Sequence, residues 1–292
     1  MRRAAAQLLA TALLLAACTP QPAAAEPPVW RVKGPAGEVT LFGSVHLLQE
    51  TTRWKSAQID ALLARADRLM FEIPMDDSAQ AAAAGKFQTL GRLPEGETLR
   101  PLLSAKGRER LEAVCAKLNL PVIAVDRLQP WMAEVLLSVS WFTKAGARTD
   151  LGVEKQIELA APPAAERAAF ESIDDQLNAL SGGSRTDQVK ALEETLEEIE
   201  TDPDSFARLA EAWARGDVKT IEREGLEELK RDAPGAYGRL VVDRNRRWVK
   251  TIEALVSKPG RTFAVVGVGH LVGPDSVPAL LRRDGVTVDG PR

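Results

Sequence analysis

The sequence predicts an α/β fold with a central, mostly parallel sheet, built from two strand–helix–strand (βαβ) units with a large helical insertion between them. Three observations predict it. Short apolar runs alternate with amphipathic stretches near both ends of the chain, and the middle has an almost continuous helical periodicity. The pattern Gly-x-x-His follows an apolar run at both Gly43–His46 and Gly267–His270. We therefore expect a single domain over residues 29–292, with the helical insertion at about 186–232.

The N-terminal unit reads as strand, helix, strand. "EVTLFGS" (38–44) is β-branched and apolar, and "RLMFEIP" (68–74) is a short apolar run that Pro74 ends. Between them, "RWKSAQIDALLARAD" (53–67) places its aliphatic residues on one helical face. A strand–helix–strand unit normally makes its two strands parallel neighbours, so residues just beyond both strands share one edge of the sheet.

The middle of the chain is mostly helical. "PLLSAKGRERLEAVCAKLNL" (101–120) is an amphipathic helix, "PVIAVDRLQP" (121–130) is a strand candidate, and the length of "WMAEVLLSVSWFTKAG" (131–146) favours a helix. From 187 to 230 the chain is acidic and periodic, with an apolar stripe of Leu192, Leu196 and Ile199. This pattern predicts surface helices that cover another layer, and a solvated face explains the glutamates better than a calcium site does.

The C-terminal unit alternates again. "LVVDRNRRWVKTIEALV" (240–256) predicts a helix and "TFAVVG" (262–267) a strand. "PDSVPALLRRDG" (274–285) predicts a helix with Asp275 or Ser276 as its cap and Gly285 at its end, and "VTV" (286–288) predicts a last strand.

The first residues have the features of a lipoprotein signal peptide (1–17). Two arginines precede an apolar run that is too short to span a membrane, and Leu-Ala-Ala-Cys ends at Cys18, the lipidation site. Cleavage after Ala23-Ala24-Ala25 is the alternative. We expect the acylated Cys18 to anchor the chain to a membrane through a tether at 18–28. Thr19 after the cysteine indicates the outer membrane, facing the periplasm.

Charge and cysteine content exclude other classes. The formal net charge of −3 becomes more negative when Arg2 and Arg3 are removed with the signal peptide, so nucleic acid is excluded as a partner. Lipidation of Cys18 leaves only Cys115, so no intramolecular disulfide forms. Cys115 falls on the apolar side of its helix pattern, which predicts a buried, inert thiol.

Both histidines of the chain, His46 and His270, lie in the repeated Gly-x-x-His pattern. With Glu72 they are expected at the carboxyl ends of three strands, where open α/β sheets bind ligands. Two imidazoles and a carboxylate suit a divalent metal (zinc, manganese or iron) that activates water. Gly43 and Gly267 would let the chain turn off each strand without a Cβ clash. The alternative for each histidine is a hydrogen-bonded core or rim residue, but Glu72 among apolar neighbours needs a cation.

Three further residues are candidates. Arg244 could clamp a substrate carboxylate or a developing oxyanion, although an arginine on an exposed helix face is the commoner case. Glu171 and Glu154 are alternatives for the general base or for a residue that orients a ligand, against the default of a surface carboxylate.

Several stretches together resemble the TraB/GumN (TraB/PrgY/GumN) family, which includes the Tiki proteases of animals. The resemblance spans Val29–Val288 and is carried by "LFGSVHLL", "LMFEIP", "LQPWMAE", "LGVEKQIELA", "FESIDDQLNAL", "AWARGD", "DRNRRW" and "VVGVGHLVGPDSVPALL". The last stretch is the most specific. The sequence departs from the family where members have a "GKPV.GLET"-like strand and this chain has "PAAERAAFESIDDQ", around Glu171.

The resemblance implies a metal-dependent hydrolase fold related to erythromycin-esterase-like and ChaN-like proteins. The family's two Gly-x-x-His motifs, its glutamate and its arginine fall on His46, His270, Glu72 and Arg244. We predict a lipid-anchored envelope metallohydrolase that acts on a peptide or on a small ester or amide. The alternative is a non-catalytic envelope lipoprotein that binds a peptide, a metal or a haem-like ligand, or supports polysaccharide export.

Overall fold

A mixed six-stranded sheet organises residues 26–291, the part of the chain that this computed structural model describes. Its strand order is β6-β4-β7-β2-β1-β8, and a second, two-stranded sheet pairs β3 with β5. The strands are β1 Val29–Lys33, β2 Gly37–Ser44, β3 Leu48–Gln49, β4 Arg68–Phe71, β5 Ala147–Arg148, β6 Glu166–Ala169, β7 Gly260–Gly267 and β8 Thr287–Asp289. Strands β6, β4, β7 and β2 are mutually parallel, and β1 is antiparallel to both β2 and β8.

The order of the parallel strands differs from the prediction in one respect. β2 and β4 are parallel, as the N-terminal strand–helix–strand pattern indicated, but they are not neighbours. β7, from the other end of the chain, lies between them and pairs with β2 from Gly37↔Gly260 to Ser44↔Gly267. Because β7 carries the second Gly-x-x-His pattern at its end, this insertion brings the two histidine motifs onto adjacent strands.

One local prediction fails, and two strands of the six-stranded sheet were not expected. The apolar run at 121–130 forms the short helix α4, Val122–Val125, and not a strand. A short apolar run has no periodicity long enough to separate a strand from a buried helical turn. The strands β1 and β6 were not expected, and β6 is an edge strand without a buried residue, so its sequence lacks the apolar signal.

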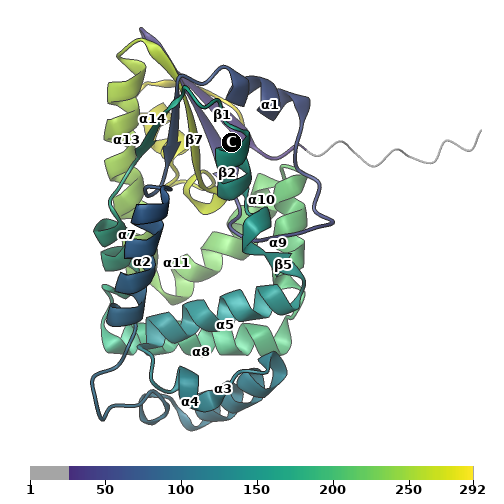
Figure 1. Cartoon of the computed structure of the whole chain (residues 1–292), viewed down its shortest axis with the longest axis vertical. Coiled ribbons are helices and arrows are strands. Elements are labelled where there is room, and N and C mark those ends of the chain that lie inside the picture. Colours follow the sequence, from purple (N-terminus) through teal and green to yellow (C-terminus); the bar gives the residue numbers. More distant parts are fainter. Residues whose placement is uncertain (1–25, 292) are drawn as a thin grey trace, which may run out of the picture.

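The helices surround the sheet and extend well beyond it (Figure 1). The α-helices are α1 Ala57–Ala64, α2 Asp77–Leu90, α3 Ala105–Leu118, α4 Val122–Val125, α5 Pro130–Lys144, α6 Val153–Ala160, α7 Ile173–Ser181, α8 Arg185–Thr201, α9 Ser205–Ala214, α10 Val218–Ile221, α11 Glu228–Asp232, α12 Pro234–Tyr237, α13 Asp243–Val256 and α14 Val277–Arg283. Short 3-10 turns are η1 Arg100–Leu102, η2 Thr149–Leu151 and η5 Val268–His270, and π-helical segments are η3 Glu222–Glu227 and η4 Gly238–Val242.

Serine side chains start several of these helices. Ser56, Ser104, Ser184 and Ser276 each accept a hydrogen bond from a backbone N–H in the first turn of the helix that follows. Such a cap satisfies one of the N–H groups that a helix start leaves without an intrahelical partner. The predicted cap of α14 is therefore Ser276, whereas Asp275 turns away to Lys230 and Tyr237.

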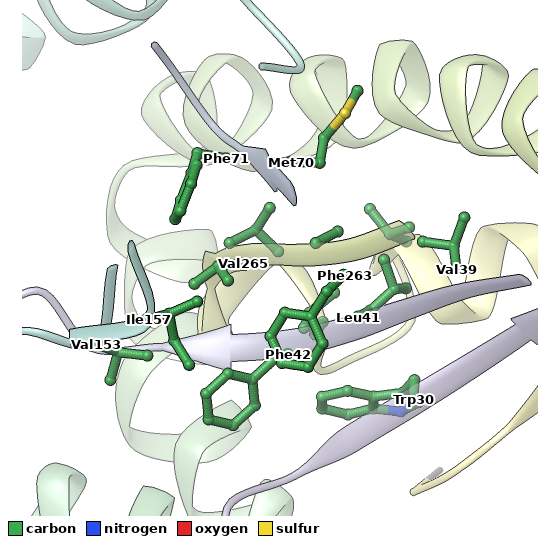
Figure 2. Packing of buried hydrophobic residues seen from close by; sticks show 14 of the residues in the cluster. Trp30, Val39, Leu41, Phe42, Met70, Phe71, Val153, Ile157, Phe263 and Val265 are labelled. Carbon is green, nitrogen blue, oxygen red and sulfur yellow. The ribbon is translucent and has the colours of Figure 1, made fainter. Parts of the chain in front are cut away.

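The sheet core holds the strands that carry the candidate site. Phe42 of β2 contacts the rings of Trp54, Trp213 and Phe263, at centroid distances of 5.8, 6.4 and 5.9 Å. Figure 2 shows Phe42 and Phe263 among the sheet side chains, together with Val153 and Ile157 of α6. Burial of large aromatic side chains stabilises such a core by about 1.5–3 kcal/mol each, so the strand ends above it are held in fixed positions.

A separate helical core lies at the far end of the molecule, where α3, α4, α5 and α8 pack together (Figure 1). The predicted stripe of Leu192, Leu196 and Ile199 is completely buried there, which confirms that α8 covers another layer. Cys115 is buried in the same core, and burial raises the pKa of its thiol to about 11. Its thiol is therefore protonated at neutral pH, as expected for an inert cysteine.

The expected signal peptide (1–17), Cys18 and most of the expected tether fall outside the described residues, so their roles stay predictions. Among residues 26–291, no helix has the length and apolar character needed to cross a bilayer.

Candidate active site

Four parallel strands end at one edge of the sheet, and each leads into a side chain that can carry chemistry. Beyond β2, β4, β6 and β7 lie His46, Glu72, Glu171 and His270, respectively. The structure thus brings the predicted residues of distant segments to the same edge, where parallel α/β sheets commonly bind ligands.

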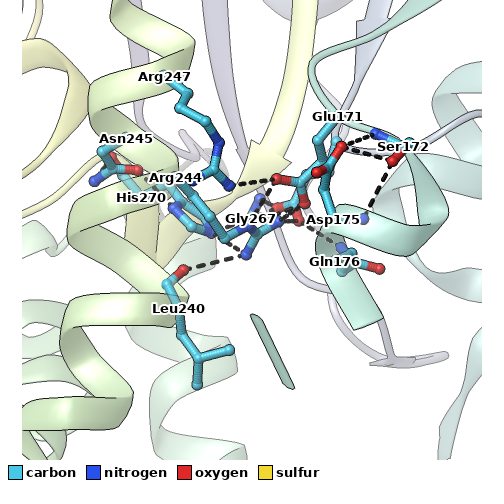
Figure 3. A network of polar contacts seen from close by, with 11 residues as sticks. Glu171, Ser172, Asp175, Gln176, Leu240, Arg244, Asn245, Arg247, Gly267 and His270 are labelled. Carbon is cyan, nitrogen blue, oxygen red and sulfur yellow. Dashed lines mark hydrogen bonds and ion pairs between the residues drawn. The ribbon is translucent and has the colours of Figure 1, made fainter. Parts of the chain in front are cut away.

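Arg244 of α13 lies at the centre of this group, between two carboxylates (Figure 3). Its Nη2 donates to Glu72 Oε2 at 2.5 Å and to Glu171 Oε1 at 2.6 Å. Its Nε donates to Glu171, and its Nη1 contacts the backbone oxygen of Leu240 at 3.2 Å and Nε2 of His270 at 3.0 Å. A guanidinium has five N–H groups, and these contacts engage all of them. Arg244 is only 5% exposed, so it is not the surface arginine that is common on helices.

The hydrogen bonds of His270 determine its tautomer. The side-chain nitrogen of Asn245 donates to the backbone oxygens of Asp275 (2.9 Å) and His270 (3.4 Å), which leaves Asn245 Oδ1 facing His270 Nδ1 at 2.7 Å. An amide oxygen only accepts, so Nδ1 carries the proton. Arg244 Nη1 only donates, so Nε2 is the accepting atom. His270 is therefore a neutral imidazole, and burial, followed by the nearby charge of Arg244, lowers its pKa to about 4.

Glu72 is ionised in spite of its burial. Burial opposes ionisation, but nearby positive charges, that of protonated His270 and then that of Arg244, lower the pKa of Glu72 to about 2. At neutral pH His270 is uncharged, so Arg244 is the cation that holds the carboxylate. The backbone N–H of Gly267 donates to Oε1 at 2.7 Å, and Gln176 donates to Oε2 at 3.1 Å. The expectation that Glu72 needs a cation is met within the protein itself.

Glu171 shares Arg244 with Glu72 but titrates differently. Burial is the main cause that raises the pKa of Glu171 above its usual value, and the negative charge of Glu72 adds to it, whereas the hydrogen bonds from Arg244 oppose it. Arg247, half exposed, approaches Glu171 Oε2 at 3.7 Å. Two carboxylates on one guanidinium therefore differ in their affinity for a proton, which is the usual condition for assigning acid and base roles.

Trp248 packs against both Arg244 and His270. Its ring lies 4.8 Å from Arg244 Cζ and 4.4 Å from the His270 ring, and Phe170 stacks on it at 5.1 Å. A guanidinium over an indole face gains roughly 0.5–2 kcal/mol. Trp248 is buried, so the cluster rests on a rigid apolar floor.

His46 belongs to a second group beside the first. Its exposed ring approaches Glu154 Oε1 through Nδ1 at 2.7 Å, and Ser44 Oγ donates to the same carboxylate oxygen at 2.5 Å. Since a carboxylate accepts, His46 Nδ1 carries a proton and Nε2 faces away from Glu154. The charge of Glu154 raises the pKa of His46 above its usual value. Burial opposes the ionisation of Glu154, but His46 and Ser44 hold the pKa of Glu154 below its usual value.

A cavity of about 320 Å³ joins the two groups. Its wall includes both His46 and Glu72, although the two residues have different partners. The polar lining is His46, Glu72, Glu154, Gln80, Gln176, Thr149 and Lys155, and the apolar lining is Phe71, Ile73 and Met75. A concave site with apolar walls and a few converging polar groups is typical of a small-molecule or peptide side-chain pocket.

The motif glycines act by close approach and not by an unusual backbone conformation. Gly267 has φ −49°, and Gly43 lies within β2, so neither needs the left-handed region that favours glycine. A Cβ on Gly43 would lie 2.8 Å from a methyl group of Val268, and one on Gly267 would lie 3.2 Å from Glu72 Oε1. Neither glycine depends on left-handed backbone, and the close approach of Val268 to Gly43 and of Glu72 to Gly267 is what a side chain at either position would disturb.

The predicted metal ligands do not fit a metal ion in this arrangement. Both imidazoles donate Nδ1–H to a fixed acceptor, which is the tautomer that metal-binding histidines use. However, the atoms of Glu72 and His270 that would bind a cation already accept from Arg244. Among residues 26–291, no group of three or more histidine, cysteine, aspartate or glutamate residues is arranged to hold a metal ion. Arg244 thus engages two of the three predicted ligands, Glu72 and His270, whereas His46 pairs with Glu154.

Comparison with known proteins places the chain in a family. The sequence profile of the TraB/PrgY/gumN family matches residues 28–290. The chain belongs to the TraB/PrgY/gumN family. This confirms the resemblance and covers almost every described residue.

The match to a curated relative assigns no role to this TraB/PrgY/gumN protein. An uncharacterized protein of Treponema pallidum (strain Nichols) is 26% identical over 268 residues, which is 87% of this chain and 80% of the relative. No solved structure matches the chain.

Sequence reasoning missed some residues that complete this TraB/PrgY/gumN site. Ser44 and Gln176 lie inside "LFGSVHLL" and "FESIDDQLNAL", two of the stretches that carry the family resemblance. Their place in these stretches was the available signal. Asn245 follows Arg244 directly in "DRNRRW". Trp248 is the last residue of the same stretch.

Proposed function

We propose that this protein is a hydrolase of peptide-like amide or ester bonds in the cell envelope, with His46 and Glu154 as its proton-transfer pair. One observation carries the proposal. Glu154 binds His46 Nδ1 at 2.7 Å, and the exposed ring lines the cavity with its Nε2 unengaged by any described residue. A histidine oriented by a carboxylate, at a cavity large enough for a substrate side chain, suits general acid–base catalysis.

The chemistry follows from the two protonation states of His46. In the neutral state, Nε2 removes a proton from water, and the water oxygen forms a bond with the substrate carbonyl carbon. The resulting imidazolium, stabilised by Glu154, then returns that proton to the departing amine or alcohol as the carbonyl–heteroatom bond breaks. Because Glu154 raises the pKa of His46, the proton-donating state dominates at neutral pH, and the base form grows as the pH increases.

Arg244 supports this chemistry as a positioning residue. All five of its N–H groups are engaged by Glu72, Glu171, Leu240 and His270. It therefore holds the Glu72 side of the cavity wall and leaves no donor for the substrate clamp expected of it. Glu171, whose pKa is raised, serves the same network and lies outside the cavity lining.

A second form of the proposal is that the hydrolase depends on a bound metal ion. Zinc, manganese or iron on His46, Glu72 and His270 would require Arg244 to release Glu72 and His270 first. Metal analysis of the purified protein tests this form. Stoichiometric metal that is lost in a folded His270→Ala variant supports it, and metal retained in that variant contradicts the ligand assignment.

The envelope location rests on the lipidation motif at Cys18. Incorporation of labelled palmitate by the wild type, and its loss in a Cys18→Ser variant, tests this part separately from activity. The proposed kinship with erythromycin-esterase-like and ChaN-like proteins rests on the sequence motifs and the mostly parallel sheet.

Turnover of quenched-fluorescence peptide pools and of p-nitrophenyl esters tests the activity. We expect kcat/KM to fall by roughly 100-fold or more in His46→Ala and in Glu154→Gln, as for the loss of a general acid–base group. The control is Glu95→Gln, which makes the same change at an exposed carboxylate remote from this pocket's lining. Unchanged turnover in His46→Ala would refute the mechanism, and peptide binding without turnover by the wild type would favour a binding lipoprotein.

A further inference from the structure

Arg239 is a half-buried arginine for which the described protein offers no acceptor. It lies in the π-helical segment η4, which leads directly into α13 and Arg244. Its Nε is completely buried and has no hydrogen-bond partner. Over residues 26–291 its guanidinium makes neither a hydrogen bond nor an ion pair, whereas all five N–H groups of Arg244 are engaged.

The missing partner is notable because the chain is rich in acids. It has 41 Asp and Glu against 38 Lys and Arg, so an acidic neighbour would be easy to supply. A partly buried charge without a counter-ion destabilises the fold, and buried polar groups normally have partners. Glu72 and Glu171 show that this protein does pair a buried arginine elsewhere. Residues 26–291 therefore leave Nη1 and Nη2 of this half-buried guanidinium open to an acceptor that they do not supply.

Gly183 lies close to the Arg239 guanidinium. A Cβ on Gly183 would lie 2.6 Å from Nη2 and 3.3 Å from Cζ of Arg239, and a Cβ on Gly235 would lie 3.5 Å from Nη1. Gly183 lies in the three-residue connection between α7 and α8, and Gly235 lies in α12. Neither glycine is among those with positive φ, so close approach to Arg239 is what distinguishes Gly183. A side chain at position 183 would displace the end of this guanidinium, whereas the distance at position 235 is an ordinary van der Waals contact.

We propose that Arg239, flanked by Gly183 and Gly235, is a binding site for a carboxylate group of a ligand. A planar guanidinium matches a planar carboxylate through two parallel N–H···O bonds. One arginine balances one negative charge, which favours a carboxylate over a doubly charged phosphate. The site lies outside the cavity lined by His46, and α7 connects the two regions, because its Gln176 binds Glu72.

The position of the site indicates a substrate class, and this step rests on the proposed function. Gln176 precedes the last residue of α7, Ser181, by five residues, which is about 8 Å of helical rise, and Gly183 lies two residues farther along the connection to α8. An extended peptide spans about 3.3 Å per residue. A peptide whose terminal carboxylate binds Arg239 would thus reach Gln176 and the Glu72 wall with about three residues.

The binding test needs no catalysis, so its outcome is separate from that of the proposed function. The ¹⁵N-labelled protein is titrated with sodium acetate at constant ionic strength, and the Arg239 Nε–Hε signal is followed after assignment by its disappearance in Arg239→Lys. We expect a saturable shift with acetate and none with acetamide. Gly183→Ala should weaken acetate at least 10-fold, because its Cβ meets the guanidinium.

The matched control is Arg246→Gln, at an exposed arginine on α13 that pairs with Asp243 at 3.7 Å. This variant should leave the acetate-dependent shift unchanged. A linear shift, or one that chloride reproduces, would overturn the proposal. Tighter binding of inorganic phosphate than of acetate would overturn the carboxylate assignment. If Gly183→Ala loses its fold, Arg239→Gln with unchanged circular dichroism replaces it, with acetate binding read by calorimetry.

Discussion

Removal of Arg244 is the most informative single perturbation of this structure. Arg244→Met keeps much of the side-chain length but leaves Glu72 and Glu171, both buried, without their shared cation. Breaking a buried ion pair by removing one partner typically costs about 3–5 kcal/mol, because the remaining charge is desolvated and unpaired. We expect a loss of that size in the free energy of unfolding at pH 7.

The stability of the wild-type protein should itself depend on pH through Glu72 and His270. Glu72 has a folded pKa of about 2 against a usual 4.5, so its stabilisation is present above pH 4.5 and is lost as the pH falls toward 2. His270 has a folded pKa of about 4 against 6.5, so the unfolded chain binds more protons between these values and stability falls from pH 6.5 to 4. Each shift corresponds to roughly 3 kcal/mol. The wild type should therefore lose stability in two successive steps on acidification.

Urea denaturation followed by tryptophan fluorescence measures this prediction at pH 7 and at pH 4.5. Without Arg244, the pKa of Glu72 rises, and its protonation relieves the unpaired charge, so the difference between variant and wild type should shrink at the lower pH. Arg246→Met is the control, since a single exposed ion pair contributes about 0–1 kcal/mol. A loss below about 1 kcal/mol at pH 7 for Arg244→Met, or a loss that does not depend on pH, would refute the assignment of Arg244 as the resident cation.

Three further predictions use the same structure. Asn245→Asp places a carboxylate at Nδ1 of His270 and should raise the pKa of His270 by about one unit or more, read from its ring proton shifts, and an unchanged titration would contradict the tautomer. Glu154→Gln removes the charge that raises the pKa of His46, so the pKa of His46 should fall toward 6.5. Any rise of activity with pH should then begin at lower pH. The chain has two histidines, so substitution of either one assigns the NMR signals directly. Leu196→Ala, at a completely buried position of the helical core, should lower the free energy of unfolding by about 2–5 kcal/mol without moving either histidine titration, whereas a shift in those titrations would show that the two cores are coupled.

Long periodic segments were predictable because their signal is local. The helices α3, α8 and α13 each present a repeated apolar face over two or more turns, and the strands β2 and β7 are continuous runs of buried residues. The edge strand β6 and the short helix α4 were not predictable, since neither segment is long enough for periodicity to outweigh its context.

The sequence predicted which residues form the candidate site but not which of them form hydrogen bonds and ion pairs with one another. A histidine after β2 and another after β7 must reach the same edge of the sheet because the two strands are parallel. The repeated Gly-x-x-His pattern indicated both histidines. Which cation meets Glu72 depends on how α13 crosses the sheet, and no local pattern records that crossing. The cation that meets Glu72 is Arg244, a residue 172 positions away from it in the chain.

The sequence by itself determined the alternating elements, the burial of Leu192, Leu196 and Ile199, and the placement of His46, Glu72 and His270 beyond strand ends. These features follow from periodicity and chain direction, which act over a few residues. Only the tertiary structure decided that β7 lies between β2 and β4, that Arg244 neutralises Glu72 and Glu171, and that Glu154 orients His46. Electrostatic partners are chosen by proximity in the folded chain, and that proximity is a property of global packing.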